Sequence, residues 1–167
     1  QHFCQIRSTL DEIEGDLISA FRNLQGEEGL EIIASGATHG FLPLLNYNPK
    51  ASQAQIDLGI ETHERFLGGE PKGFWLPECG YTPGIDEILA QKGIRYFFTD
   101  SHGILNATPR PRFATYAPVF CPSGVAAFGR DWESSKQVWS SQEGYPGDPN
   151  YREFYRDIGH DLDFEYL

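Results

Sequence analysis

The expected fold class follows from one stretch, "GFWLPECGYTPGIDEILAQKGIRYFFTD", residues 73–100. Residues 73–78 predict a strand, and the proline and glycine of residues 81–84 predict a turn. Residues 85–93 predict a helix that begins close to Pro83 and ends at Gly93. Residues 94–100 predict another strand, apolar enough to be buried on both faces. This order predicts a β-α-β unit with parallel strands.

The same alternation extends to both sides of this stretch. Apolar residues three and four positions apart predict a helix over residues 3–25, and a similar pattern predicts another over residues 52–66. Residues 30–37 predict a short buried strand. Residues 114–122 and 124–131 predict one strand each or a hairpin, residues 132–141 a short helix, and residues 151–159 a helix or an irregular aromatic segment. The chain is therefore expected to be an α/β protein with a parallel sheet or barrel.

Composition excludes some classes of partner. The 167 residues include 24 acidic and 13 basic side chains, for a net charge of −11. Without a Lys/Arg cluster, neither a nucleic acid nor an anionic membrane is expected as a partner. No apolar run approaches the length of a transmembrane helix. An aromatic content of 14% suits a neutral polar ligand such as a sugar.

The cysteines and the first residue concern compartment and completeness. Cys4, Cys79 and Cys121 form no C-x-x-C pair and are odd in number, so we expect no disulfide framework and a cytoplasmic location. The chain begins at Gln1 and contains no methionine, so we expect an internal piece of a longer protein.

Glu78 is the main candidate for chemistry. It follows Pro77 in an apolar run between Trp75 and Tyr81, whose rings could stack on a sugar. A carboxylate held in such a pocket can act as a nucleophile, an acid or a base. Taken from these residues alone, a glutamate that caps or ion-pairs near the end of a strand explains the pattern equally well. Cys79 has no identifiable base as partner and is interpreted as a packing residue.

Other polar residues follow predicted strands. His39, Glu78 and Asp100 each come just after a strand, and in parallel α/β folds the carboxyl ends of strands meet at one edge. Asp100 and His102 form a D-x-H pair that could face one way from an extended segment. Two such ligands do not complete a metal site. His39 alone is more typical of a structural hydrogen bond than of catalysis.

An aromatic cluster lies near the carboxyl terminus. Trp139, Tyr145 and the aromatic residues of positions 151–155 are interleaved with charged residues in loops rich in glycine and proline. Such a cluster is either core or a wall on which sugars stack. We treat residues 101–155 as a possible lid or insertion, with Trp139 and Tyr145 as candidate substrate-binding residues.

Four separated motifs carry a family resemblance. "ATHGFLPLL" (37–45), "GFWLPECGYTPG" (73–84), "RYFFTDSHG" (95–103) and "GYPGDPNYREFYRDIG" (144–159) resemble the glycoside hydrolases of family 57, and most of all their 1,4-α-glucan branching enzymes. The resemblance implies a (β/α)7 barrel, a distorted TIM-like fold, of which residues 1–167 form a single partial catalytic domain. It also implies α-glucans such as glycogen, amylose or maltooligosaccharides as partners, and no metal or cofactor.

The resemblance assigns a role to individual residues. It makes Glu78 the nucleophile of a retaining double displacement. It places His39 and Trp75 in the glucan-binding cleft, with Asp100 and His102 near the same rim; Tyr81 is added as a stacking residue. The segment that carries the family's aspartate acid/base is not matched, because neither Asp100 nor Asp131 lies in its motif. The chain alone is therefore expected to be inactive.

Several alternatives remain open at this point. A 4-α-glucanotransferase or an α-amylase-type hydrolase of the same family would differ only in its acceptor. A metal-dependent polysaccharide deacetylase would use His39, Asp100 and His102 as ligands. A non-catalytic glucan-binding fragment would need no carboxylate chemistry.

Overall fold

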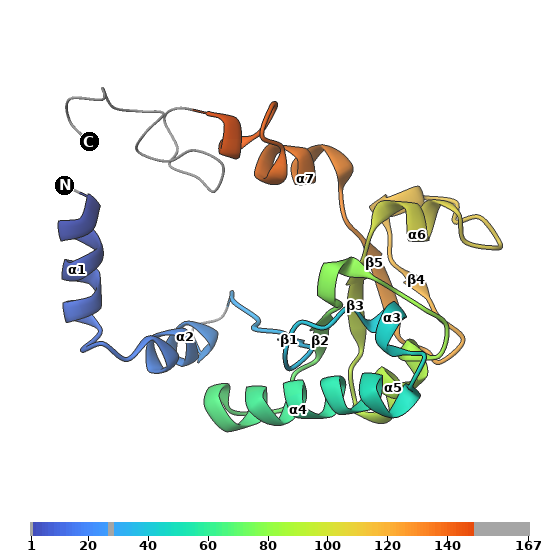
Figure 1. Cartoon of the computed structure of the whole chain (residues 1–167), viewed down its shortest axis with the longest axis horizontal. Helices are drawn as coiled ribbons and strands as arrows, with labels where there is room; N and C mark the ends of the chain where they lie inside the picture. Colours follow the sequence, from blue (N-terminus) through green and yellow to red (C-terminus); the bar gives the residue numbers. More distant parts are fainter. Residues whose placement is uncertain (1, 27–28, 149–167) are drawn as a thin grey trace.

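A computed structural model describes residues 2–26 and 29–148 of the chain (Figure 1). The described helices are α1 His2–Glu12, α2 Leu17–Gly26, α3 Leu42–Leu45, α4 Pro49–Leu67, α5 Ile85–Gln91, α6 Ser101–Leu105 and α7 Trp132–Trp139. The strands are β1 Ala34–Ser35, β2 Gly73–Trp75, β3 Tyr96–Thr99, β4 Val119–Phe120 and β5 Ala126–Gly129. Short 3-10 turns are η1 Pro77–Cys79, η2 Ala114–Tyr116 and η3 Tyr145–Gly147. None of the described helices is both long and apolar enough to cross a membrane.

Within the described residues, the strands form one five-stranded sheet in the order β1-β2-β3-β5-β4. Neighbours from β1 to β5 are parallel, and β4 pairs antiparallel with β5 at the edge. The α/β class and the β-α-β unit of residues 73–100 are confirmed. Of the two options for residues 114–131, the hairpin is the correct one. The predicted segment 151–159 lies outside the described residues.

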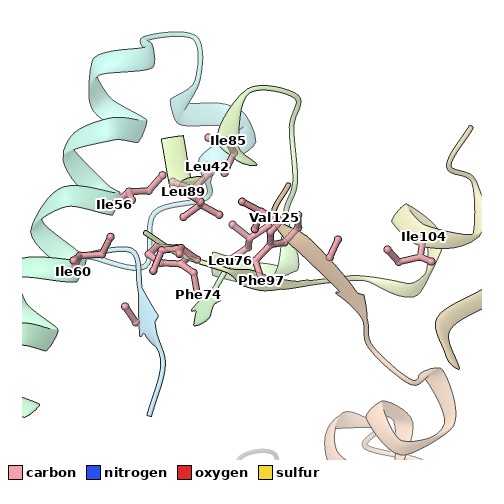
Figure 2. Packing of buried hydrophobic residues seen from close by; sticks show 13 residues of the cluster. Leu42, Ile56, Ile60, Phe74, Leu76, Ile85, Leu89, Phe97, Ile104 and Val125 are labelled. Carbon is pink, nitrogen blue, oxygen red and sulfur yellow. The ribbon is translucent and has the colours of Figure 1, made fainter. Parts of the chain in front are cut away.

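Helices α4 and α5 cover one face of the sheet and form the core with it (Figure 2). Phe74 of β2, Leu76 directly after this strand and Phe97 of β3 are at most 1% exposed. The helices contribute apolar side chains at helical spacing, which are Ile56, Ile60, Ile85 and Leu89. Burying side chains of this size contributes about 1.5–3 kcal/mol each, so this layer holds the parallel strands in register.

The strand of residues 94–100 is not buried on both faces, contrary to the prediction. Phe97 and Thr99 are buried, whereas Tyr96 and Phe98 on the opposite face are only partly buried. There the rings of Tyr96 and Phe98 lie 5.8 Å apart, and Phe128 of β5 lies 5.8 Å from Phe98. An alternating pattern is what a sheet covered by helices on one face requires.

The predicted helix over residues 3–25 is two helices, α1 and α2, which lie to one side of the sheet in Figure 1. Glu14 and Gly15 interrupt it with φ values of 54° and 76°. Asp16 then begins α2 by accepting a 2.9 Å hydrogen bond from the Ser19 amide. The Ser19 hydroxyl donates a second hydrogen bond of 2.6 Å to Asp16, and this bond, together with the one from the amide, lowers the pKa of Asp16. Capping and the left-handed turn thus override a continuous apolar pattern.

Candidate active site

Glu78 lies in a tight turn directly after β2. The turn begins at Pro77, and both Glu78 and Cys79 have a φ of 52°. Two consecutive non-glycine residues in this region store backbone strain, which is typical of functional sites. Leu76 and Cys79 are buried, whereas the side chain of Glu78 is 75% exposed. The apolar run therefore anchors the turn in the core and leaves one carboxylate facing outward.

The loop after β1 brings His39 to this carboxylate. Its Nε2 lies 3.6 Å from Oε1 of Glu78. Gln55 of α4 fixes the loop, because its side chain accepts a 2.9 Å hydrogen bond from the Thr38 amide and donates one of 2.9 Å to Oγ1 of Thr38. Sequence analysis did not identify Gln55. A polar residue on the side of α4 that faces β1 is the signal that could have found it.

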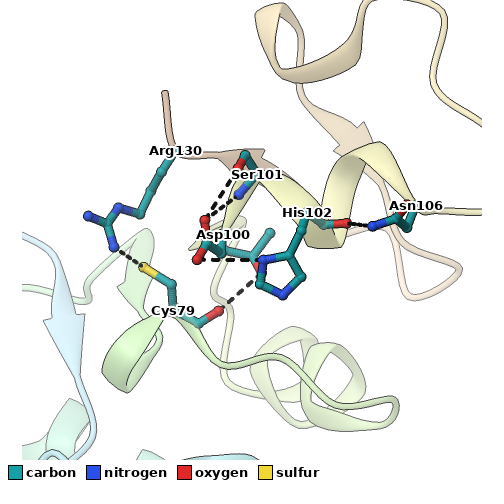
Figure 3. Close-up of polar contacts among 7 residues, drawn as sticks. Cys79, Asp100, Ser101, His102, Asn106 and Arg130 are labelled. Atoms are coloured by element: carbon teal, nitrogen blue, oxygen red, sulfur yellow. Dashed lines mark hydrogen bonds and ion pairs between the residues drawn. The ribbon is translucent and has the colours of Figure 1, made fainter. Parts of the chain in front are cut away.

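Asp100 follows β3 and begins α6. Its carboxylate accepts a 2.7 Å hydrogen bond from the Ser101 amide, and its Oδ2 lies 3.6 Å from Nδ1 of His102 (Figure 3). The predicted extended D-x-H segment is therefore wrong. Aspartate is a strongly preferred N-cap, so the chain turns into a helix after Asp100.

Arg130 follows β5, lines the same cleft as Glu78 and Asp100, and points its side chain toward Cys79 (Figure 3). Its Nη1 lies 3.6 Å from Sγ of Cys79, and its Cζ lies 5.8 Å from the ring centre of Trp75. Burial raises the pKa of the Cys79 thiol, and the Arg130 hydrogen bond opposes that rise. Cys79 is thus a buried, neutral thiol, in agreement with its interpretation as a packing residue.

A cleft of about 710 Å³ separates these strand ends from α7. Helix α7 begins at Asp131, which accepts a 2.8 Å hydrogen bond from the Ser134 amide; this bond lowers the pKa of Asp131. The side chains of Trp132 and Trp139 are 61% and 68% exposed. The cleft is lined by His39, Trp75, Glu78, Asp100, Arg130, Trp132, Ser135, Lys136, Trp139 and Ser140.

Five of the predicted site residues therefore share this cleft, namely His39, Trp75, Glu78, Asp100 and Trp139. Sequence analysis missed Arg130, Trp132 and Lys136. The spacing of Trp132, Lys136 and Trp139 on one helical face is the signal that could have found the α7 side.

The other predicted residues lie elsewhere. Tyr81 stacks on Phe97 at 5.5 Å and donates a 3.0 Å hydrogen bond to Asp86. Burial, together with this bond, raises the pKa of Tyr81. Tyr145 of η3 lines a separate hollow of about 150 Å³ with residues of the α7–η3 segment. His102 is not among the residues that line the large cleft.

The described residues contain no group of three or more His, Cys, Asp or Glu side chains placed to hold a metal ion. His39 faces Glu78, whereas His102 faces Asp100. The three ligands of the deacetylase alternative therefore do not converge.

Comparison with known proteins identifies a matching family and several similar proteins. The model of Glycosyl hydrolase family 57 matches residues 5–158. A 1,4-α-glucan branching enzyme from Thermococcus kodakarensis is 37% identical over 93% of this chain and 27% of its own length.

Two solved structures share the fold as well. An α-amylase, AmyC, from Thermotoga maritima is 48% identical with a TM-score of 0.84, over 99% of this chain and 32% of its own. A family-57 branching enzyme from Pyrococcus horikoshii is 39% identical with a TM-score of 0.79, over 95% of this chain and 32% of its own. The chain spans about a third or less of the length of these relatives, and over that span it belongs to Glycosyl hydrolase family 57.

Proposed function

We propose that this chain carries the nucleophile of a retaining 1,4-α-glucan branching enzyme, and that the nucleophile is Glu78. One observation carries the proposal: a strained turn exposes the carboxylate of Glu78 to a cleft whose walls bear three tryptophan side chains, Trp75, Trp132 and Trp139. Flat apolar rings suit the C–H faces of glucosyl units, and a cleft of this size suits an oligosaccharide. The similarity to two branching enzymes supports the choice of reaction.

In the proposed reaction, Glu78 attacks the anomeric carbon of an internal α-1,4 bond. The bond between that carbon and the glycosidic oxygen breaks, and an acid protonates the departing oxygen. The 6-hydroxyl of a second glucan segment then attacks the glycosyl–enzyme ester, loses its proton to the same residue acting as base, and releases Glu78. The result is an α-1,6 branch with two inversions and hence net retention. His39 and Trp75 are proposed to bind the donor, together with Asp100.

Helix α7 is proposed to hold the acceptor and to limit the access of water. Preference for a hydroxyl over water requires an acceptor positioned beside the ester, which aromatic side chains opposite Glu78 would provide. We expect Trp139→Ala in the full-length protein to raise the ratio of hydrolysis to transfer about three- to tenfold. The variant loses a contact with the acceptor glucan, whereas water still reaches the glycosyl–enzyme ester. Reducing ends and new branch points, counted on amylose, measure the ratio.

Val138→Ala is the matched control, because Val138 is on the same helix but does not line the cleft. Its ratio should stay at the wild-type value. An unchanged ratio in Trp139→Ala would contradict the role of α7. Tyr145, also proposed as part of this wall, lies outside the cleft in the described structure and should show a smaller effect.

A second candidate is hydrolysis of α-1,4 bonds. The observation that favours it is the α-amylase from Thermotoga maritima, which is 48% identical over 99% of this chain. Incubation with amylose followed by a debranching enzyme separates the two. A branching enzyme yields short chains only after debranching and few new reducing ends, whereas an amylase yields reducing ends directly.

The domain is proposed to be one part of a larger barrel, because relatives of about three times its length match over nearly all of it. The acid/base is proposed to lie outside these 167 residues. General acid assistance commonly contributes about 10²–10⁴-fold in rate, so residues 1–167 expressed alone should show no measurable branching. Branching by that polypeptide at a rate close to that of the full-length protein would contradict this. The free thiols of Cys4, Cys79 and Cys121 suit the proposed cytoplasmic location.

A further inference from the structure

Arg130 holds an unusual position among the basic residues. It is half-buried in the cleft, and no carboxylate lies within 4 Å of its guanidinium in the part of the chain that the structure describes. Lys72, Lys92 and Lys136 each pair with an acid nearby, and the other arginines that the structure describes are exposed. A partly desolvated guanidinium without an ion pair usually has another task.

The contacts of Arg130 all lead to the turn of Glu78. One nitrogen, Nη1, reaches Sγ of Cys79 at 3.6 Å, and the guanidinium lies over the ring of Trp75 at 5.8 Å (Figure 3 shows the first contact). Trp75 precedes Glu78 by three residues and Cys79 follows it directly. Arg130 therefore touches the chain on both sides of Glu78 without contacting Glu78 itself within ion-pair distance.

The backbone of Arg130 is also connected to the turn of Glu78. Its backbone amide donates a 3.0 Å hydrogen bond to the carbonyl of Thr99, and Oγ1 of Thr99 donates one of 3.2 Å to the carbonyl of Cys79. Both ends of the arginine thus connect to Cys79, one through its side chain and one through β3. Because Glu78 and Cys79 have positive φ values, neighbouring groups must hold them there.

We infer that Arg130 is a positioning residue for the proposed nucleophile: its planar guanidinium clamps Trp75 and Cys79 and so fixes the turn that presents Glu78. The inference rests on the proposed function of Glu78. Lysine would not replace it, because its single ammonium group is a point charge, whereas the guanidinium can donate to the thiol from one nitrogen while its Cζ lies over the indole. An alternative is that Arg130 affects Glu78 only through its positive charge. The other titratable or charged residues that line the same cleft are His39, Asp100 and Lys136.

The test measures how fast Glu78 is glycosylated in the full-length protein. A mechanism-based fluorosugar traps the glycosyl–enzyme, and mass spectrometry of the peptides identifies the labelled residue. We expect Arg130→Met to slow trapping about 10- to 100-fold with KM for maltooligosaccharides changed less than about threefold, since misplacing a reacting group costs rate rather than binding. Arg130→Lys should recover little of the rate, and Cys79→Ala should lose part of it.

The trapping rate of a double variant provides a second test, because it measures the coupling between Arg130 and Cys79. If the arginine acts through Cys79, the double variant Arg130→Met/Cys79→Ala should be no slower than Arg130→Met, whereas independent effects would multiply. Arg112→Met is the matched control, because Arg112 makes the same kind of contact with Phe113, at 5.3 Å, away from the cleft. It should trap at the wild-type rate.

The outcomes separate two failures. Label on a residue other than Glu78 in the wild-type protein rejects the proposed function. Label on Glu78 with wild-type rates in Arg130→Met, or full recovery by Arg130→Lys, rejects the positioning role and leaves the nucleophile in place. A raised KM with unchanged trapping at saturation would make Arg130 a substrate-binding residue and also rejects it. If Arg130→Met does not fold, the Arg130→Lys and Cys79→Ala rates decide by the same criteria.

Discussion

Glu78→Gln in the full-length protein is expected to lower kcat for glucan transfer by at least about 10⁴-fold. Losses of this order follow when a covalent nucleophile is removed, because the remaining groups bind the substrate without forming the intermediate. The free energy of unfolding should change by less than about 0.5 kcal/mol, since the side chain of Glu78 is 75% exposed and its contact with His39 is 3.6 Å long. Branch formation on amylose and thermal unfolding measure the two quantities.

Glu61→Gln provides the matched control, because Glu61 is exposed on α4 and does not line the cleft. It should keep wild-type activity. Glucan affinity, measured for Glu78→Gln by calorimetry, should stay within about threefold of the wild type. Unchanged transfer activity in Glu78→Gln would show that the nucleophile lies elsewhere in the full-length protein, and would support a non-catalytic, glucan-binding role for residues 1–167.

The regular part of the fold could be predicted from the sequence because its signals are local. Residues 73–100 contain a strand, a turn with Pro83, a helix that ends near Gly93 and a strand, and the structure has each of them. The break near Gly15 was missed although its signal is also local. Asp16 with Ser19 three positions later is a capping pattern, and the apolar periodicity of the two flanking helices concealed it.

Only part of the candidate site could be predicted from the sequence, because the order of the strands in the sheet decides which residues meet. Glu78 and His39 belong to motifs that follow parallel strands, so their convergence was expected. Arg130 lies 51 residues from Cys79 and reaches it only because β5, not β4, pairs with β3. The order of strands in a sheet is not encoded in any short pattern. Trp132 was missed for a similar reason, since a helix face acquires a role only when the cleft it borders is known.

Gly59→Ala is expected to destabilise the protein strongly, by about 3 kcal/mol or more. Gly59 lies on the buried side of α4, where the helix backbone packs directly on β1, and a Cβ there would overlap the carbonyl oxygen of Ser35. A carbonyl in a strand cannot move aside as a flexible side chain can, so the helix itself must shift. Helix propensity alone would make alanine more favourable than glycine by about 1 kcal/mol. A decrease in the free energy of unfolding would therefore identify the clash with Ser35 as the cause.

Gly26→Ala separates helix propensity from packing. Gly26 is also helical, and nothing lies within 4 Å of a Cβ built there. This variant should be neutral or slightly stabilising in urea unfolding, whereas Gly59→Ala should unfold at a clearly lower midpoint. The shift of α4 would also move Gln55, which holds the loop of His39 beside Glu78. Gly59→Ala should therefore lower glucan transfer even at temperatures where the protein remains folded, and wild-type stability and activity together would show that α4 does not set the position of His39.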